Sequence, residues 1–238
     1  MARVAGRIGV LAALGLVALA SSALAARPAK NPGPDSHGLS GLWMNENTLD
    51  ERLKREGRRR LDPGESDGAA RATPSLTPQY QAIQAQMKAS APAEGATSCR
   101  WVGLPGIMTY PYPFEILATP GRLTFVFETD SQVRRIWLDR RRHLDADDLD
   151  PSYYGDSIGR WEGDTLVVDT IGFNTQTTVN GAPHSEQMHV VERFKRRRDG
   201  RLEDRMTIAD PQAFAKPFDQ TIVYGRRPGW RIREYSCN

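Results

Sequence analysis

Hydrophobic and polar residues alternate with a period of two through most of the second half of the chain. The alternation begins near Phe114 and is interrupted by the turn sequences Pro120-Gly121, Glu162-Gly163-Asp164, Asp199-Gly200 and Pro228-Gly229. A period of two is typical of strands with one buried face, and Asp-Gly or Pro-Gly between such runs is a strong hairpin signal. The pattern therefore predicts about nine consecutive strands in antiparallel order.

In chain order the predicted strands are PFEILAT, RLTFVFET, SQVRRIWLD, SIGRW, TLVVDTI, MHVVERFKR, RLEDRMTI, TIVYGR and WRIREYSC. A long antiparallel sheet without helical crossovers tends to curl and close, because closure removes its exposed edges. We therefore expect a mainly β protein whose antiparallel meander closes into a lipocalin-like barrel. A two-sheet sandwich is the alternative.

One segment before the strands has helical spacing instead. Tyr80, Ile83 and Met87 recur three and four residues apart, and Thr77-Pro78 is a typical helix start, with Thr as N-cap and Pro at the first position. We predict a short helix over residues 77–90, packed at an end or flank of the barrel.

The N-terminus has the features of a secretory signal peptide over residues 1–26. Arg3 and Arg7 give a positive start, an apolar run follows, and small residues favour cleavage after Ala25 or Ala26. No later segment reaches the roughly 20 apolar residues of a spanning helix. The sequence thus predicts a soluble periplasmic or secreted protein.

The rest of the chain divides at the predicted helix. Residues 27–76 are rich in Pro, Gly and charged side chains and are expected to form a flexible N-terminal segment. Residues 77–238 have a length that suits one folded domain, made of the helix and the barrel.

The charge balance argues against a nucleic-acid partner. The chain has 32 Lys and Arg residues against 29 Asp and Glu, and loss of Arg3 and Arg7 with the signal brings the net charge to about +1. Nucleic-acid binding needs a clustered basic face, whereas the arginines here alternate with acids, as in RRDGRLEDR.

Two cysteines are present, Cys99 and Cys237, outside any CxxC pattern. That spacing argues against zinc ribbons and attached haem. In an oxidising compartment two cysteines suggest one disulfide, which would join the start of the folded body to its last predicted strand. Two free thiols are the alternative.

Several polar residues on strand faces are candidates for acid–base chemistry. Asp169 shares a face with two apolar neighbours and is expected to point inward, with Arg160 or Arg193 as its cation. Glu192 falls on the apolar face of its strand, an unusual place for an acid unless it is paired or functional. Two interpretations of such inward-facing acids stay open: they form structural ion pairs, or they line a polar spot in a ligand cavity.

Histidines supply the proton carrier for such chemistry. His184 lies in a loop before a strand, at the expected barrel rim, and His189 lies on that strand; either needs a carboxylate to orient it. His37 and His143 are expected to be solvent-exposed. The catalytic candidates are His184, His189, Glu192, Asp169 and Arg160. The spacing of the histidines and acids matches no zinc signature, so no metal is expected. Acid–base chemistry of this kind needs no organic cofactor.

Aromatic and charged side chains near loops and strand ends are candidates for a binding mouth. They would contact a small apolar or aromatic molecule. The ligand-binding candidates are Tyr112, Tyr154, Trp161, Phe173, Arg193 and Glu186.

Seven motifs carry a family resemblance. They are Gly41-Leu-Trp43, Leu76-Thr-Pro78, Pro111-Tyr-Pro-Phe-Glu-Ile116, Arg134-Arg-Ile-Trp-Leu-Asp139, Gly155 to Asn174, His184 to Phe194, and Cys237. In these the chain resembles a large family of exported bacterial proteins with a GxSIGRWEGDTLVVDT…HSExxHVVERF signature, which brings no established activity. Asp156 stands where that pattern has histidine, so any chemistry of that histidine is altered here. Gly41-Leu-Trp43 also resembles the G-x-W of the first strand in lipocalin-like barrels.

Two functions are consistent with these residues. The first is a cofactor-independent acid–base enzyme acting on a small apolar substrate by isomerisation, cyclisation, hydration or hydrolysis. The second is a lipocalin-like carrier of a lipid, terpenoid or aromatic ligand without catalysis. A third possibility, an envelope protein that contacts partner proteins through residues 27–76, predicts a filled barrel.

Overall fold

A computed structural model of the chain describes residues 35, 37–46, 73–90, 101–139, 141–145 and 147–235. The predicted signal peptide, most of residues 27–76 and both cysteines lie outside these ranges. The signal peptide and the disulfide therefore stay predictions.

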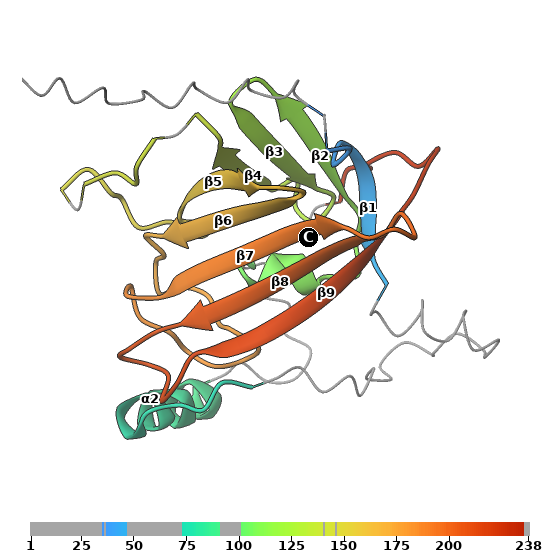
Figure 1. The fold of residues 1–238 in the computed structure, drawn as a ribbon. Coiled ribbons are helices and arrows are strands. Elements are labelled where there is room, and N and C mark those ends of the chain that lie inside the picture. The colour runs from blue at the N-terminus through green and yellow to red at the C-terminus, as the bar shows by residue number, and fades with distance from the viewer. Residues whose placement is uncertain are drawn as a thin grey trace, which may run out of the picture. The chain divides into compact units, whose positions relative to one another are not determined.

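Nine strands close into a barrel, in which each strand pairs with the next along the chain and the last pairs with the first (Figure 1). The strands are β1 (Gly41–Asn45), β2 (Phe114–Thr119), β3 (Arg122–Phe127), β4 (Val133–Trp137), β5 (Asp156–Glu162), β6 (Thr165–Ile171), β7 (His189–Arg196), β8 (Leu202–Ala209) and β9 (Phe218–Arg226). The prediction of a mainly β, lipocalin-like barrel is confirmed.

Three of the predicted hairpins occur at the expected turns. They join β2 to β3, β5 to β6 and β7 to β8, and each turn contains a glycine with a positive φ, at Gly121, Gly163 and Gly200. Glycine adopts this backbone conformation without the Cβ clash of other residues. The local turn signals thus fix these pairings.

The meander is not antiparallel throughout. Strands β4 and β5 run parallel, with Ile136 opposite Ser157. Parallel neighbours need a crossover of about a dozen or more residues, and residues 138–155 provide it. The prediction of a purely antiparallel order is wrong at this step, because the long connection carries the chain back to the end of the sheet at which β4 begins.

The seam of the barrel also differs from the prediction. The segment WRIREYSC forms no strand in its described part; Tyr235 makes only an isolated bridge to Thr129. Instead β1 pairs antiparallel with β9, with Trp43 opposite Arg226. β1 comes from the segment expected to be flexible, so residues 41–45 belong to the folded barrel. Burial of the Trp43 side chain favours β1 at this edge over a charged C-terminal strand.

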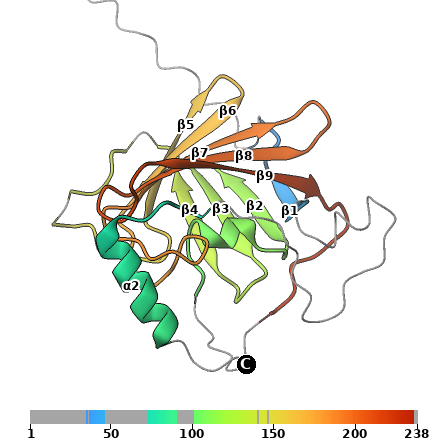
Figure 2. The same ribbon diagram turned by 90° about the horizontal axis from the view of Figure 1, so that it is seen from below.

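The helix is where the sequence predicts it. α2 spans Pro78–Ala89 and flanks the barrel (Figure 2). Thr77 does not cap it through its side chain, because the hydroxyl donates to the Gln212 carbonyl oxygen at 2.8 Å. A short 3-10 helix, η1 (Gly106–Thr109), is anchored to β9 by the Tyr224 hydroxyl, which donates to the Met108 carbonyl oxygen. Neither helix, nor any other in the described ranges, has the length and apolar character for a membrane crossing.

Aromatic rings fill much of the lumen. Phe114 lies 5.6 Å from Phe125 and 5.0 Å from Tyr224, and Phe125 lies 5.6 Å from Phe194. All four are buried, as is Trp43. Each such ring buries roughly 150–250 Å², so a ligand in the lumen must displace part of the core.

Candidate functional site

Two histidines and two aspartates form a hydrogen-bonded chain outside the barrel. One oxygen of Asp169, Oδ1, lies 3.0 Å from His189 Nε2 and 2.9 Å from His143 Nε2. The other ring nitrogen of His143 lies 2.8 Å from Asp156 Oδ2. The order of contacts is Asp156, His143, Asp169, His189, and we call these four residues the outer cluster.

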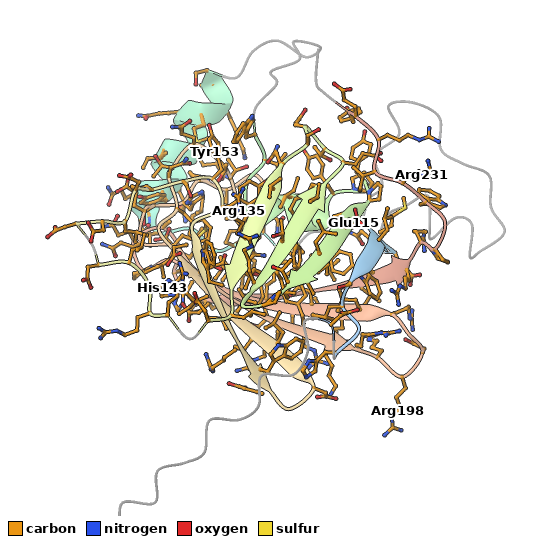
Figure 3. The ribbon with its side chains drawn as sticks, turned by 90° about the horizontal axis from the view of Figure 1, so that it is seen from above. Glu115, Arg135, His143, Tyr153, Arg198 and Arg231 are labelled. Carbon is orange, nitrogen blue, oxygen red and sulfur yellow. The ribbon has the colours of Figure 1, made fainter. Side chains whose placement is uncertain are left out.

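Strand alternation brings the outer cluster together. Asp156, Asp169 and His189 take outward positions on the neighbouring strands β5, β6 and β7, and the residue next to each of them, Ser157, Thr170 and Val190, is buried. His143 reaches them from the connection 138–155, beside these strands (Figure 3). The parallel crossover is therefore what supplies the second histidine.

Exposure increases along the outer cluster. The side chains of Asp156 and His143 are 14% and 18% exposed, that of Asp169 is 30% exposed and that of His189 is 42% exposed. Among the described residues, His189 Nδ1 has no hydrogen-bond partner. The cluster therefore ends in an imidazole nitrogen that solvent or a small molecule can reach.

Apolar side chains surround the outer cluster on the same face. Ile158 and Val191 stand opposite Asp169 in the two neighbouring strands, and Ile171 stands opposite Asp156. All three are half-buried. The surface beside the cluster can thus hold an apolar molecule.

The contacts indicate where protons lie. His143 has a carboxylate oxygen within hydrogen-bond distance of each ring nitrogen, so a ring that carries a proton on both nitrogens can donate to both acids. His189 needs only one proton, on Nε2, to donate to Asp169, which leaves the lone pair on Nδ1. Among the described residues, no group of three or more His, Cys, Asp or Glu side chains is arranged to hold a metal ion.

His184 does not join the outer cluster. It is buried at 3% exposure; its Nε2 accepts from the Thr177 hydroxyl at 2.9 Å, and its Nδ1 donates to the Ser185 carbonyl oxygen at 3.1 Å. Burial lowers its pKa below the ordinary value of 6.5, which favours the neutral ring that these two contacts require. Both nitrogens are occupied, so His184 holds the loop before β7.

Glu192 points into the lumen, as its place on an apolar strand face predicts. The buried guanidinium of Arg134 donates to both of its carboxylate oxygens; Nη1 lies 2.8 Å from Oε1. Ser157 and Thr170 accept further hydrogen bonds from Arg134, each at 3.2 Å from Nη2. Arg134 is not among the predicted site residues, although its position two residues before the buried Ile136 places it on the inward face of β4.

A second acid in the lumen was also missed. Asp204 is fully buried, and neither carboxyl oxygen has a hydrogen-bond partner in the described part of the chain. Burial first, and then the charge of Glu192, raise the pKa of Asp204 well above its ordinary value of 3.8. The alternation of Leu202, Asp204 and Met206 is a sequence signal that would have placed it inside.

Other candidate residues lie elsewhere than expected. Asp169 points outward instead of inward, and its partners are histidines. Arg160 and Arg193 are exposed and both pair with Glu162, at 2.7 Å and 3.0 Å. His143, expected to be solvent-exposed, is mostly covered by its two carboxylate partners.

The proposed ligand-binding residues are dispersed. Trp161 stacks on His37 with ring centroids 3.5 Å apart, and Tyr112 stacks on Tyr235 at 4.9 Å. Phe173 is buried in the core. Of the other three, Arg193 pairs with Glu162, the Tyr154 hydroxyl donates to Gln132, and Glu186 is exposed in a loop.

A comparison with models of known protein families gives no match, and a search among curated proteins finds no relative. The family resemblance therefore stays a prediction from the motifs.

The backbone entering the outer cluster depends on a glycine. Gly155 precedes Asp156, has φ +62°, and a Cβ there would lie 2.3 Å from the Ile171 carbonyl oxygen. Gly163 has nearly the same φ, +63°, but open space around it. A positive φ alone costs an alanine about 1–2 kcal/mol, so Gly155→Ala is expected to lose more stability than Gly163→Ala. Urea unfolding of both variants measures the difference, and equal losses would show that the close contact is unimportant.

Proposed function

We propose that the protein is a general acid–base enzyme whose site is the outer cluster. His189 is the general base, and Asp169 orients it. The observation that carries the proposal is the shared oxygen of Asp169, which lies within 3.0 Å of both imidazole rings while His189 Nδ1 is left open. A carboxylate that fixes one ring nitrogen and leaves the other free is the arrangement of a positioned base.

The proton steps follow from the contacts. His189 Nδ1 removes a proton from water or from an acidic C–H of the substrate, and the negative charge of Asp169 stabilises the imidazolium that forms. His143 and Asp156 are positioning residues, because they hold Asp169 from its other side. Hydrolysis by an activated water and isomerisation by proton abstraction both begin in this way.

The substrate class follows from the surface around the base. The half-buried side chains of Ile158, Ile171 and Val191 favour a small, largely apolar molecule lying on the outer face of β5 to β7. The alternative function, carriage of an apolar ligand inside the barrel, gains no support from the described residues, because aromatic rings occupy that space.

His189→Gln and Asp169→Asn are expected to lose about 100-fold or more in kcat/KM, since a positioned acid–base group contributes roughly 10²–10⁴-fold. The assay is a panel of three small apolar probes: an activated ester, an epoxide and a β,γ-unsaturated ketone. Lys195→Gln is the matched control, because Lys195 is an exposed outward residue of the same strand. No turnover of any probe by the wild type, or equal turnover by His189→Gln, contradicts the proposal.

A measurement without substrate tests the orientation of the base. In the wild type, the ¹⁵N resonances of the His189 ring should report a proton on Nε2, and Asp169→Asn should mix the two tautomers, because the carboxylate selects the proton position. An unchanged tautomer in Asp169→Asn would contradict the orienting role of Asp169.

A further inference from the structure

A groove of about 710 Å³ lies outside the barrel, away from the outer cluster. Its volume is in the range of roughly 300–1,000 Å³ that is typical of small-molecule sites. It forms where β1, β2 and the end of β9 meet the segment that follows β9. Its lining residues are Gly41, Leu42, Glu115, Arg226, Arg227, Pro228, Gly229, Trp230, Arg231 and Ile232.

A fixed turn presents the most exposed side chains of the groove. The Trp230 amide donates to the Arg227 carbonyl oxygen at 3.3 Å, and Gly229 has φ +80°. Proline at the second position and a positive φ at the third define a type II turn, which has little conformational freedom. The turn therefore fixes the backbone of Trp230 at the groove, and Arg231 follows it directly.

Trp230 is unusual in being 54% exposed. Tryptophan is highly buried on average, and the described residues provide no stacking partner for this indole. The residue lines the groove and is exposed, so its ring is available to an aromatic ring of a ligand.

The charges of the groove favour an anion. Three of its residues are arginines, and Glu115 is the single acid among the lining residues. Arg226 donates to the Ser40 carbonyl oxygen at 2.7 Å and lies over the Trp43 ring at 5.6 Å. Arg231, which is labelled in Figure 3, makes no hydrogen bond or ion pair with any described residue. Its guanidinium is the cation left for a ligand.

We propose that this groove binds a small aromatic carboxylate. The aromatic ring of the ligand stacks on Trp230, and Arg231 donates two parallel hydrogen bonds to the carboxylate, the geometry that a guanidinium fork and a carboxylate share. This site is independent of the acid–base function proposed for the outer cluster.

The probe is 1-naphthoate, titrated against the wild-type protein and followed by ligand-detected NMR. A ligand of this size with one ion pair and one stacking contact is expected to bind with a Kd on the order of 1 mM. Arg231→Gln and Trp230→Leu should each weaken binding about fivefold or more, and the neutral analogue 1-naphthamide should bind correspondingly less well than 1-naphthoate.

Three controls make the result specific. Arg198→Gln removes an exposed arginine that does not line the groove and should leave the Kd unchanged. His189→Gln should also leave it unchanged, which separates this site from the outer cluster. Circular dichroism verifies that each variant is folded; both groove side chains are exposed, so the fold should be retained.

The proposal is overturned if 1-naphthoate shows no saturable binding, if 1-naphthamide binds equally well, or if Arg198→Gln weakens binding as much as Arg231→Gln. The last result would identify a non-specific attraction of anions to surface arginines. Loss of binding in His189→Gln alone would place the ligand at the outer cluster instead.

Discussion

Replacing Arg134 with methionine is expected to lower the free energy of unfolding by about 3–5 kcal/mol, the usual range when one partner of a buried ion pair is removed. The substitution keeps an apolar side chain in the lumen but removes both hydrogen bonds to the Glu192 carboxylate. Ser157 and Thr170 lose a donor as well. The cost therefore comes chiefly from an acid left without a cation in the core.

Equilibrium unfolding in urea measures this effect against two controls. Arg135→Met changes the next residue, which points to solvent, and is expected to stay within about 0.5 kcal/mol of the wild type. The double variant Arg134→Met with Glu192→Leu removes both charges and should recover most of the loss, since apolar replacements of a buried pair are often neutral. A similar loss in Arg134→Met and Arg135→Met would contradict a structural role for the pair.

The second large effect is a dependence of stability on pH that one residue, Asp204, produces. Because its pKa is raised in the folded barrel, the native state holds this proton over a pH range in which the unfolded chain has released it. The contribution of Asp204 is therefore fully present below the ordinary value of 3.8 and is lost as pH rises toward the folded pKa. The free energy of unfolding falls by about 1.4 kcal/mol per pH unit over the range in which the folded state holds this proton and the unfolded chain does not.

Asp204→Asn should remove this slope, because the amide has the shape of the protonated acid and does not ionise. The variant is expected to match the wild type below the ordinary carboxyl pKa of 3.8 and to become progressively more stable than the wild type as pH rises above it. Urea unfolding across this range provides the measurement, with the exposed Asp147→Asn as control. Parallel curves for wild type and Asp204→Asn would show that Asp204 is not protonated in the barrel.

The local features of the fold were predictable from the sequence, and its long-range pairings were not. A glycine turn and the alternation around it lie within a few residues of each other, so each hairpin is specified by its own segment. The choice between β1 and the C-terminal segment at the edge of β9 depends on which of two distant segments buries more apolar surface. The parallel step between β4 and β5 likewise depends on the path of a long connection.

The site residues divide in the same way, into features specified by a single strand and features that depend on distant segments. Glu192 was placed on the correct face because its neighbours on β7 alternate cleanly, but its partner is 58 residues away. The prediction for Asp169 is wrong because it rests on two apolar neighbours on its side of β6, Val167 and Ile171; Val167 faces outward although it is only 1% exposed. In the sheet Val167 stands between Arg160 and Arg193, whose aliphatic stems shield outward-facing apolar residues. An apolar residue that is covered on the outside of the barrel therefore gives the same sequence alternation as one that faces the lumen.

The seam between β1 and β9 has a consequence for the order of folding. It joins segments from opposite ends of the polypeptide; the hydrogen bond from Arg226 to Ser40 spans 186 positions. Hairpins such as β7–β8 pair residues that are close in sequence and can form early, but the ring of strands stays incomplete until β9 meets β1. Contacts of such long sequence separation slow folding. Newly made chains should therefore remain open, with both edge strands unpaired, for longer than chains of the same size in which all paired strands are close in sequence.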